Sequence, residues 1–579
     1  MGFEIIEREE AYDVLIVGSG AGGGMAVKTL SDAGLRVALI EAGPDYDPAD
    51  PEQQTQLKWP YQSPRRGAGT VRDIGEFTAS LGGWKIEGEP YTNTKDTEFR
   101  WYRSRMIGGR TNHWGRISLR FGPDDFRRRS IDGLGDDWPI TYDDVKPFYD
   151  RVDKMIGVFG TREGIYNEPD GFFLPPPKPR LHELLVQKAA ARINIPVIPA
   201  RLSVLTRPIS KSRGVCFYCN QCNRGCSVYG DFSSSSVLIK PARKSGHVDV
   251  YTNAMVREVL TNAEGLATGV LYIDKTDLQE YRVRARVVVL AASACESARI
   301  LLNSRSARFP NGVANSSGMV GRYLHDSTGA VRSAFIPQLM DRKRYNEDGV
   351  GGMHAYIPWW LDNKKLGFAR GYHVELGGGM TMPMYGFGFG IQALNGKYPD
   401  KNGQQKPAGG YGLSWKEDVK RFYGATVSFA GRGESIALES NYCKIDPATV
   451  DKWGIPVLQF HYQWTDQELK QARHMHDTFE ELIHQMGGVP NGEKPGESEQ
   501  YGLAKPGAII HEVGTTRMGN DPSRSVLNKY NQAHDCRNLF VVDGGPFVSQ
   551  ADKNPTWTIL ALSLRAAEYM IDQFRKKNL

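Results

Sequence analysis

The sequence has no apolar run approaching the roughly 18 residues that a transmembrane helix needs, so no direct membrane span is expected. Its first residues, MGFEIIEREE, lack the basic and apolar regions of a signal peptide. Ile6 stands where an N-myristoylation signal requires Ser or Thr. The net charge is +6 over 579 residues, and this near balance argues against a nucleic-acid partner. Taken alone, these absences favour a cytoplasmic protein.

The composition excludes a disordered or fibrous chain. Hydrophobic residues make up 40% of the sequence and aromatic residues 10%, which is ordinary for a globular enzyme. A chain of this length predicts roughly two to four domains. Cysteine is scarce outside one segment. Cys295, Cys443 and Cys536 are isolated, and we interpret them as small buried hydrophobic residues.

The first motif is a glycine-rich turn between two apolar segments. Residues 12–17, YDVLIV, are typical of a buried parallel strand, and they run into Gly18, Gly20 and Gly23, where a helix opens. A second apolar segment, RVALIEAG, follows and carries Glu41 near its end. This order of strand, GxGxxG, helix, strand and acid is the dinucleotide-binding fingerprint.

Each residue of this fingerprint has a physical role. Gly18 permits the tight turn, Gly20 lets the backbone approach a pyrophosphate, and Gly23 lets the helix pack closely on the strand. The free N–H groups at the helix N-terminus bind the anion, and Glu41 accepts hydrogen bonds from ribose hydroxyls. The motif alone does not separate FAD from NAD, because both are bound in this way.

Two stretches near the end of the chain carry further signals. The first is HEVGTTRMG, which begins at His511. In the second, LFVVDG is typical of a strand that ends at Asp543 and Gly544. Asn554 then precedes Pro555, and proline is a favoured first residue of a helix.

With these stretches, the sequence resembles the glucose–methanol–choline (GMC) oxidoreductases along nearly its whole length. Besides the glycine motif and the C-terminal strand and helix, the resemblance rests on RMIGGRTNHWG (105–115), VVVLAASACESARILLNS (287–304), VGRYLHD (320–326) and WGIPVLQFHYQ (453–463). It implies an α/β fold, with a Rossmann-like FAD-binding domain and a second, α+β domain whose antiparallel sheet binds the substrate.

GMC proteins interleave their two domains along the chain, so the resemblance implies discontinuous boundaries. It places the FAD-binding domain at residues 1–130, 235–325 and 505–579. It places the substrate-binding domain at residues 135–215 and 326–504. The cysteine-rich segment lies between two of these pieces.

Two glycine-rich segments, 371–390 and 422–438, are interpreted as strands of the substrate-binding sheet. By the resemblance, such strands cover the flavin. Their aromatic residues fit either a sugar-stacking surface or an ordinary β-sheet core. Glu434 is a candidate for binding a substrate hydroxyl.

The resemblance also implies the cofactor contacts. It places Asp543 and Gly544 near the ribityl–pyrophosphate of FAD, and the N-terminus of the helix beginning at Pro555 near the flavin, where its dipole stabilises the reduced form. The other contacts that it implies are Gly109, Asn112, His113 and Thr556. Some relatives with His-Trp at this position attach FAD covalently, so a histidyl–FAD bond at His113 and simple packing beside the flavin ring are both open.

By the same resemblance, His511 takes the place of the family's catalytic histidine and Asn554 that of its polar partner. Hydride transfer from a carbinol carbon requires removal of the hydroxyl proton, which a neutral imidazole does near pH 7. The amide of Asn554 would hold the substrate oxygen and stabilise developing alkoxide charge. The alternative is a structural histidine and an asparagine that caps the following helix.

Four cysteines lie close together in the segment 214–230. Cys216, Cys219, Cys222 and Cys226 have the spacing C-x2-C-x2-C-x3-C. Cysteines this close make poor disulfides, and zinc sites usually use two separated pairs. The spacing is that of bacterial ferredoxins, although no proline follows the last cysteine and there is no second cysteine run. It therefore predicts an iron–sulfur cluster, with zinc or unligated thiols as alternatives.

The cysteine segment sharpens the resemblance. It is similar to that of the flavoprotein subunits of bacterial FAD-dependent sugar dehydrogenases of the glucose, gluconate, fructose and glucoside 3-dehydrogenase types. Some of these carry a [3Fe-4S] cluster on a C-x5-C-x3-C pattern, which Cys216, Cys222 and Cys226 match. Cys219 as a fourth ligand leaves a [4Fe-4S] cluster open. Such subunits are exported folded with a small twin-arginine partner subunit, which implies that partner and a periplasmic location, with a cytoplasmic location as the alternative.

The expected activity is oxidation of a secondary or anomeric hydroxyl of a sugar or glycoside by hydride transfer to FAD. Electrons would leave through the cluster to an external acceptor such as a cytochrome c. One alternative is a GMC oxidase or alcohol dehydrogenase with a structural cysteine loop. Another is an electron-transfer or assembly subunit that binds FAD without a substrate of its own.

Overall fold

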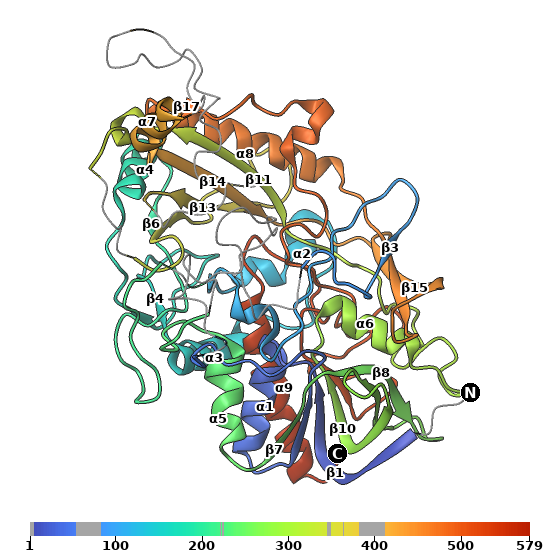
Figure 1. The fold of residues 1–579 in the computed structure, drawn as a ribbon. Helices are drawn as coiled ribbons and strands as arrows, with labels where there is room; N and C mark the ends of the chain where they lie inside the picture. Colours follow the sequence, from blue (N-terminus) through green and yellow to red (C-terminus); the bar gives the residue numbers. More distant parts are fainter. Residues whose placement is uncertain are drawn as a thin grey trace.

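The computed structural model shows two large sheets, one in the lower and one in the upper half of Figure 1. It describes residues 5–51, 53, 83–220, 222, 225–343, 349–362, 364–380, 404 and 412–579. Strands of each sheet come from segments far apart in the sequence, so the chain passes between the two halves more than once. This is the discontinuous arrangement of an α/β protein with an α+β second domain.

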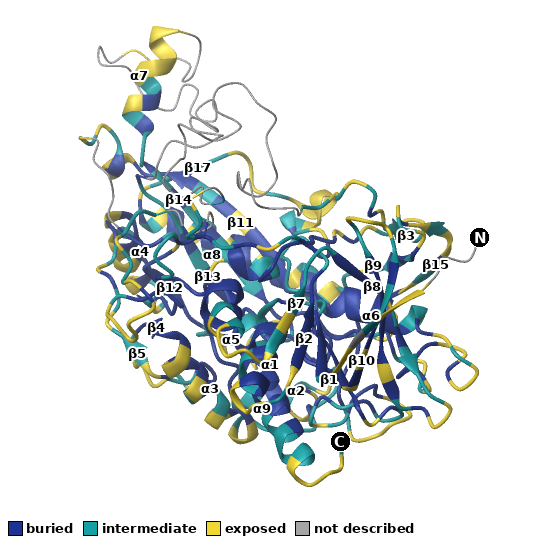
Figure 2. Ribbon diagram, turned by 60° about the horizontal axis from the view of Figure 1, so that its bottom comes forward, coloured by how far each residue is buried: buried dark blue, intermediate teal, exposed yellow. Residues whose placement is uncertain are grey.

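The lower sheet has a parallel centre. β1 (Ile5–Val17) pairs in parallel with β2 (Val37–Ile40) and with β10 (Glu280–Leu290). β7 (Val248–Tyr251) extends the sheet beyond β2, and β18 (Leu539–Val541) pairs in parallel with β10. The central strands are buried (dark blue in Figure 2), which explains their nearly continuous apolar sequences.

Helices and an antiparallel extension complete the lower half. β9 (Ala267–Asp274) pairs antiparallel with β10, and β8 (Ala254–Thr261) pairs with β9. α1 (Ala21–Asp32) and α9 (Thr556–Arg575) lie side by side and are buried along one face (Figures 1 and 2). α6 (Ala294–Asn303) packs against β8. The first and last helices of the chain therefore share one layer.

The upper sheet has six strands, each antiparallel to its neighbours. In spatial order they are β17 (Val489–Pro490), β11 (Thr328–Phe335), β14 (Thr426–Gly433), β13 (Tyr372–Gly378), β12 (Ala355–Ile357) and β6 (Ile198–Pro199). α8 (Asp466–Gln485) packs on this sheet through buried residues such as Met475 and Phe479. The predicted antiparallel sheet is confirmed, although residues 381–390 of the expected strand 371–390 lie outside the described residues.

A smaller sheet links the two predicted domains. β15 (Tyr442–Val450) and β16 (Pro456–His461) form a hairpin, and β16 pairs in parallel with β3 (Thr92–Asn93). The hairpin lies within the predicted substrate-binding segment 326–504, whereas β3 lies within the predicted FAD-binding segment 1–130. The remaining elements are β4 (Val158–Phe159), β5 (Phe173–Leu174), α2 (Arg128–Asp132), α3 (Tyr142–Ile156), α4 (Leu181–Ala191), α5 (Lys240–Arg243), α7 (Leu413–Phe422) and the short helical turns η1 (Gly109–Asn112), η2 (Pro123–Phe126), η4 (Ser235–Ile239), η5 (Pro337–Leu339) and η7 (Glu497–Gly502).

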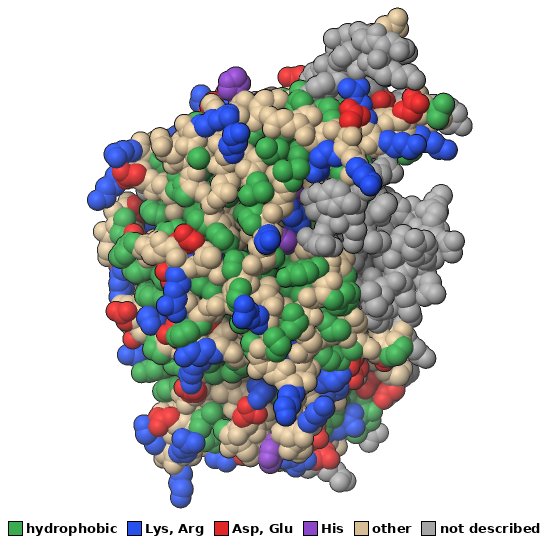
Figure 3. All heavy atoms as spheres, turned by 90° about the vertical axis from the view of Figure 1, so that its left-hand side faces the viewer, with side chains coloured by type: hydrophobic (Ala, Val, Ile, Leu, Met, Phe, Trp, Pro, Cys, Tyr) green, Lys and Arg blue, Asp and Glu red, His purple; other side chains and the backbone are tan. Residues whose placement is uncertain are grey.

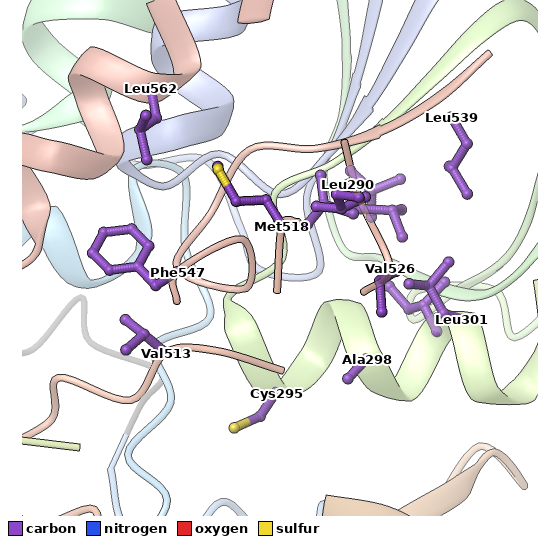
Figure 4. Packing of buried hydrophobic residues seen from close by; sticks show 14 of the residues in the cluster. Leu290, Cys295, Ala298, Leu301, Val513, Met518, Val526, Leu539, Phe547 and Leu562 are labelled. Carbon is purple, nitrogen blue, oxygen red and sulfur yellow. The ribbon is translucent and has the colours of Figure 1, made fainter. Parts of the chain in front are cut away.

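The largest hydrophobic core lies where the lower sheet meets α6 and the C-terminal segment (Figure 4). Leu290 at the end of β10 and Ala298 of α6 belong to it, together with Cys295. Cys295, Cys443 and Cys536 each expose at most 2% of their surface. The isolated cysteines are therefore small buried hydrophobic residues, as predicted.

The surface mixes charges of both signs. On the face drawn in Figure 3, Lys and Arg side chains are scattered among acidic, polar and apolar ones. This distribution matches the nearly balanced net charge of +6. Of the helices that the structure describes, none combines the length and the apolar character needed to cross a membrane.

Candidate active site

A cavity of about 340 Å³ lies at the carboxyl ends of the parallel strands. Gly18 follows β1 and Glu41 follows β2, and both line it. Ala291 follows β10 and Asp543 follows β18, and both also line it. The crevice beyond the carboxyl ends of the strands is where open α/β sheets bind ligands.

Three helices begin at the wall of this cavity. Ala21 opens α1, Ala294 opens α6 and Thr556 opens α9, and all three residues line the cavity. The first turns of α1 and α9 carry no acidic side chain, so no carboxylate of their own offsets the positive ends of these helix dipoles. The cavity is therefore suited to a large anionic ligand.

The glycines of the fingerprint differ in their surroundings. Gly18 has a φ of +94°, in the left-handed region that favours glycine. A Cβ on Gly23 would lie 1.9 Å from the carbonyl oxygen of Gly18, so the close packing of α1 on the turn requires glycine. A Cβ on Gly20 would meet no protein atom within 4 Å, and Gly20 lines the cavity. The space in front of Gly20 is thus open to a ligand.

Glu41 is 6% exposed and faces the same cavity. Its carboxylate accepts hydrogen bonds from the Ser19 backbone N–H at 3.2 Å, the Ser19 hydroxyl, and the Gly43 N–H at 2.8 Å. Burial raises the pKa of Glu41, and these hydrogen bonds oppose the shift. A carboxylate has about four acceptor sites, so capacity for a ribose hydroxyl remains.

The segment GGRTNHWG forms the turn η1 beside the cavity. Gly109 and His113 line the cavity, and His113 Nε2 lies 3.0 Å from the Ser104 hydroxyl. Burial, followed by the charges of nearby arginines, lowers the pKa of His113 to about 3, so its imidazole is neutral. Asn112 does not line the cavity: its amide donates to a backbone carbonyl of the turn at 2.8 Å. The cofactor contact of Asn112 therefore stays a prediction.

The C-terminal residues Asp543, Gly544 and Thr556 all line the cavity. Asp543 accepts hydrogen bonds from the Ser297 hydroxyl and from a backbone N–H two residues later. Burial raises the pKa of Asp543 to about 6. α9 begins at Thr556, one residue later than the sequence predicted, and Pro555 is its N-cap residue.

These residues fit the FAD that the sequence predicts. A pyrophosphate would be held by the Gly18–Gly20 turn and the N-terminus of α1. A ribose would be held by Glu41, which retains acceptor capacity. Asp543 and Thr556 would contact the ligand from the C-terminal segment. When bound, FAD supplies a flavin that accepts a hydride.

His511 lines the cavity with Asn554, and its hydrogen bonds define its protonation. The Ser327 hydroxyl lies 3.0 Å from Nδ1, and the Asn554 amide nitrogen lies 3.3 Å from Nε2. Because an amide N–H can only donate, Nε2 is the acceptor and the ring proton is on Nδ1, donated to Ser327. The Asp326 carboxylate accepts the backbone N–H of His511 at 2.8 Å and fixes the loop. His511 therefore offers an unprotonated Nε2 to the cavity.

Asn554 is oriented by a carboxylate. Its amide nitrogen also donates to Glu375 Oε1 at 3.3 Å, which places the NH₂ group, and not the oxygen, toward both Glu375 and His511. Within the described part of the chain, its Oδ1 is buried without a hydrogen-bond partner. Because Pro555 is the N-cap residue of α9, the structure does not place Asn554 in the capping role.

Three charged side chains of the upper sheet surround this pair, and the sequence analysis missed them. β13 and β14 are antiparallel with His373 opposite Arg432, and Glu375 lies two residues along β13 on the same face. Glu375 lies 3.5 Å from His373 Nε2 and 3.4 Å from Arg432 Nη2. The polar–apolar alternation in HVELG indicates that His373 and Glu375 share a face. Nothing local indicates that Arg432 is their neighbour.

These charges set the protonation of the site. Burial acts on Glu375 in the opposite direction, but Arg432 and His373 outweigh it and lower the pKa of Glu375 to about 2. Burial first, and then the charge of Arg432, lowers the pKa of His511 to about 3, while Glu375 opposes that shift. At neutral pH, Glu375 is ionised and His511 is a neutral proton acceptor.

Glu434 lies elsewhere, in a buried ionic network. It is 1% exposed and pairs with Arg128 at 2.8 Å and with Arg370. Asp125 of the same network pairs with Lys553, next to Asn554, at 2.9 Å. The structure therefore does not bring Glu434 to the cavity, and its predicted contact with a substrate hydroxyl has no structural support.

The residues of the cysteine segment 214–230 that the structure describes do not line the cavity. One backbone N–H group lies near the sulfur of each of Cys216 (3.4 Å), Cys222 (3.3 Å) and Cys226 (3.2 Å). Burial raises the pKa of Cys216 to about 12 and that of Cys226 to about 11. Among the residues described, no three Cys, His, Asp or Glu side chains are arranged to hold a metal ion. As placed, Cys216, Cys219, Cys222 and Cys226 do not fit the predicted iron–sulfur cluster, which therefore stays a prediction.

Comparison with protein families matches two segments of the chain. The N-terminal model described as GMC oxidoreductase matches residues 186–328, and the C-terminal model of the same description matches residues 439–563. The first segment includes the cysteine segment and much of the lower sheet, and the second includes His511, Asp543 and Asn554. Both matches therefore fall on the parts of the chain that build the cavity.

Curated relatives and a solved structure match over nearly the full length. A 2-methyl-1,2-propanediol dehydrogenase of Mycolicibacterium austroafricanum is 28% identical over 97% of this chain and 95% of its own. The fructose dehydrogenase large subunit of Gluconobacter japonicus is 26% identical over 97% of this chain and 98% of its own. The crystal structure of pyridoxine 4-oxidase from Mesorbium loti covers 96% of this chain and 99% of its own, with a TM-score of 0.60 and 17% identity. The last match shows the fold alone.

Proposed function

Because the chain belongs to the GMC oxidoreductase family and acts on CH–OH groups, we propose that it is an FAD-dependent dehydrogenase of a secondary or anomeric hydroxyl of a sugar or glycoside. The observation that carries the proposal is the unprotonated Nε2 of His511 beside the amide of Asn554 in the cavity. The relative named as a fructose dehydrogenase supports the choice of a sugar, and it and the relative named as a diol dehydrogenase support the choice of a dehydrogenase.

The residues of the site have separate roles in alcohol oxidation. A substrate hydroxyl that enters between His511 and Asn554 donates its proton to Nε2 and accepts an amide N–H from Asn554. The Ser327 hydroxyl oxygen accepts a hydrogen bond from the Nδ1–H group and so holds the ring in place. Nε2 therefore stays available as the base. As the proton leaves, negative charge grows on the substrate oxygen, and the amide dipole stabilises it. The hydride leaves the carbon of the same C–OH group.

Glu375 supports the proton transfer electrostatically. When His511 takes the proton it becomes a cation near Arg432, which disfavours it, whereas Glu375 favours it. The carboxylate therefore offsets part of the penalty for charging His511. Without it, the base would be weaker.

The test is the rate of anaerobic flavin reduction in a His511→Ala variant. D-Glucose, D-fructose, D-gluconate and 2-methyl-1,2-propanediol serve as substrates. Removal of a positioned general base is expected to slow the rate by about 10²–10⁴-fold with bound FAD unchanged. The exposed His247→Ala is the matched control and should keep the wild-type rate. Unchanged reduction by His511→Ala would overturn the assignment of His511 as the base, whereas a wild type that none of these compounds reduces would favour an FAD-binding subunit without its own substrate.

The iron–sulfur cluster is proposed from the spacing of the cysteines and from the resemblance to the flavoprotein subunits of bacterial sugar dehydrogenases. We derive no electron-transfer step through it, because the placed thiols do not form a metal site. Iron and acid-labile sulfide measured on anaerobically purified protein decide the point. About three or four iron atoms per chain would establish the cluster. If both elements are missing, a GMC oxidase or alcohol dehydrogenase with a structural cysteine loop is favoured.

The electron acceptor, the small exported partner subunit and the periplasmic location are proposed from the same resemblance. Co-expression with a small subunit that carries a twin-arginine signal, followed by fractionation, tests the last two. Recovery of the chain in the periplasm without that subunit would contradict co-export.

A further inference from the structure

The search for further function leads to the charged pair on the upper sheet. Glu375 and Arg432 retain 17% and 19% of their side-chain surface and lie beside the residues His511 and Asn554 of the cavity wall, although neither is itself among the residues that line the cavity. Glu375 Oε1 lies 3.3 Å from Asn554 Nδ2, and the same nitrogen lies 3.3 Å from His511 Nε2. The carboxylate is therefore one hydrogen bond away from the point where the reacting hydroxyl binds.

Neither member of the pair is saturated by its neighbours. The contacts of Glu375 with Asn554, His373 and Arg432 are 3.3, 3.5 and 3.4 Å long, at or beyond the end of the usual hydrogen-bond range. Arg432 donates from Nη1 to the carbonyl of Gly431 at 3.0 Å, and a guanidinium carries five N–H donors. Both groups therefore have capacity for a ligand.

Their chemistry selects the ligand group. An ionised carboxylate only accepts hydrogen bonds, and a guanidinium only donates them. A hydroxyl does both, so one hydroxyl can donate to Glu375 and accept from Arg432 at the same time. A carbonyl or an ether oxygen would satisfy Arg432 alone. An alkyl group would satisfy neither.

We propose that Glu375 and Arg432 bind a second hydroxyl of the substrate, on the carbon next to the one that is oxidised, so that the substrates are vicinal diols, with sugars as one class of them. The two hydroxyls of such a diol lie within hydrogen-bonding reach of each other, and Glu375 Oε1 lies 3.3 Å from the Asn554 amide nitrogen that would hold the first hydroxyl. This inference rests on the proposed function and names its substrate class. It assigns specificity to two side chains that the glycine motif and the C-terminal motif do not include.

The experiment compares matched substrates by the second-order rate of anaerobic flavin reduction in the FAD-loaded enzyme. The pairs are 1,2-propanediol with 2-propanol, and D-glucose with 2-deoxy-D-glucose. A hydrogen bond to a charged group corresponds to about 10- to 100-fold, so the diol member of at least one pair should be faster by that factor. In Glu375→Gln both members of a pair should slow, because His511 loses the carboxylate that supports it, and the preference for the diol member should in addition fall by at least about tenfold.

Ser428→Ala is the matched control. Ser428 lies on the same strand and the same face as Arg432, four residues or roughly 13 Å away, where it bonds to Ser333. The preference of the Ser428→Ala variant for the diol member of each pair should equal that of the wild type. Arg432→Lys keeps the charge but not the fork of donors, so it should retain part of the preference. FAD absorbance checks that each variant is folded and loaded.

The outcomes separate this inference from the proposed function. Equal rates for the diol and its matched analogue in the wild type would overturn the inference alone. An equal loss on both members of a pair in Glu375→Gln would also overturn it, because Glu375 would then act on His511 and not on a second hydroxyl. If none of the four compounds reduces the flavin, the proposed function fails and this inference falls with it.

Discussion

The lower sheet builds the cavity and the upper sheet contacts its catalytic pair through Glu375, and the two arrangements depend on different kinds of sequence information. On the lower sheet, Gly18, Gly20 and Gly23 follow one strand within a single turn, and each acts through its own backbone. On the upper sheet, His373 and Arg432 meet because two strands distant in sequence pair in register. The first arrangement is local in the sequence, and its positions require particular residue types. The second depends on long-range pairing, and other residue types could occupy the same positions.

This difference corresponds to the two ligands expected at the site, the cofactor and the substrate. A pyrophosphate is recognised by backbone N–H groups and a helix N-terminus, so the requirement is for small residues at fixed spacing. A substrate is recognised by side chains that converge from several segments. Relatives with different named substrates can therefore share the first arrangement and differ in the second. Four variants test this comparison.

Gly23→Ala should have the largest effect on function, because it should abolish FAD binding as well as destabilise the fold. Its Cβ would lie 1.9 Å from the backbone oxygen of Gly18, so the turn and α1 must separate. We expect overpacking to cost about 1–3 kcal/mol and FAD occupancy to fall close to zero after gel filtration. FAD absorbance per chain and the Tm of the FAD-free protein are the measurements.

Gly20→Ala is the matched variant in the same turn. No protein atom lies within 4 Å of the added Cβ, so the Tm of the FAD-free protein should stay within about 1 °C of the wild type. FAD should still bind more weakly, because the methyl group occupies space open to the ligand. If Gly20→Ala binds FAD as tightly as the wild type, the pyrophosphate does not lie at this turn.

The same contrast explains which parts of the site could be predicted. The cavity-facing glycines and the pair His511 and Asn554 lie in short motifs whose spacing carries their meaning. Glu375 could not be assigned, because its role depends on Arg432 of another strand and on Asn554 near the end of the chain. Glu434 was named from the sequence instead, as the acid of the other glycine-rich segment, 422–438. It follows β14 directly and turns into a buried network with arginines.

The cysteine segment shows the converse case, in which a clear sequence motif does not by itself establish a site. Its spacing is distinctive, yet the structure does not gather the thiols into a metal site. A ligand spacing specifies which residues can converge, and the metal itself supplies the free energy that makes them do so. The sequence alone therefore could not determine whether these cysteines bind a metal.

Lys553→Met should have the next largest effect, which is on the free energy of unfolding. It tests the part of the site that depends on contacts between distant segments of the chain. Lys553 is fully buried and pairs with Asp125 at 2.9 Å and Asp552 at 2.6 Å. Removing one partner of a buried pair costs about 3–5 kcal/mol, because the other charge is left unpaired. We expect the Tm to fall by roughly 5 °C or more.

The control for this variant is Lys576→Met. Lys576 pairs with Asp572 at 2.6 Å, but the two side chains are 60% and 48% exposed. Exposed pairs contribute little, so its Tm should change by less than about 2 °C. Equal shifts for the two variants would contradict a structural role for the buried network next to Asn554.

Arg432→Met tests whether the upper sheet controls the base on the lower side of the cavity. In the wild type the pKa of His511 is about 3, so Nε2 is unprotonated above that pH and kcat/KM should hold its plateau down to about pH 4. Removing a like charge raises the pKa of the base by roughly 1–3 units. In the variant the base is then protonated at a higher pH, and kcat/KM should begin to fall below about pH 5–6.

The pH profile of kcat/KM, measured from pH 4 to 8, is decisive because a loss of binding alone would lower the plateau without moving the acid limb. Arg284→Met, which removes an exposed arginine of β10, is the control and should keep the wild-type profile. A variant profile that is lower but parallel to that of the wild type would mean that Arg432 does not act on His511.

Cys219→Ser should have the smallest effect, and it tests the one motif on which sequence and structure disagree. Cys216, Cys222 and Cys226 each have a backbone N–H near their sulfur, and such groups stabilise sulfur that carries negative charge. These three match the C-x5-C-x3-C pattern, so a bound cluster would depend on them and not on Cys219. We expect Cys219→Ser to keep the iron content and the rate of electron transfer to an artificial acceptor, and Cys222→Ser to lose both. If Cys219→Ser also loses its iron, all four cysteines are ligands. If neither variant differs from an iron-free wild type, the spacing has no metal-binding role in this chain, and the segment belongs with the isolated cysteines as a structural element.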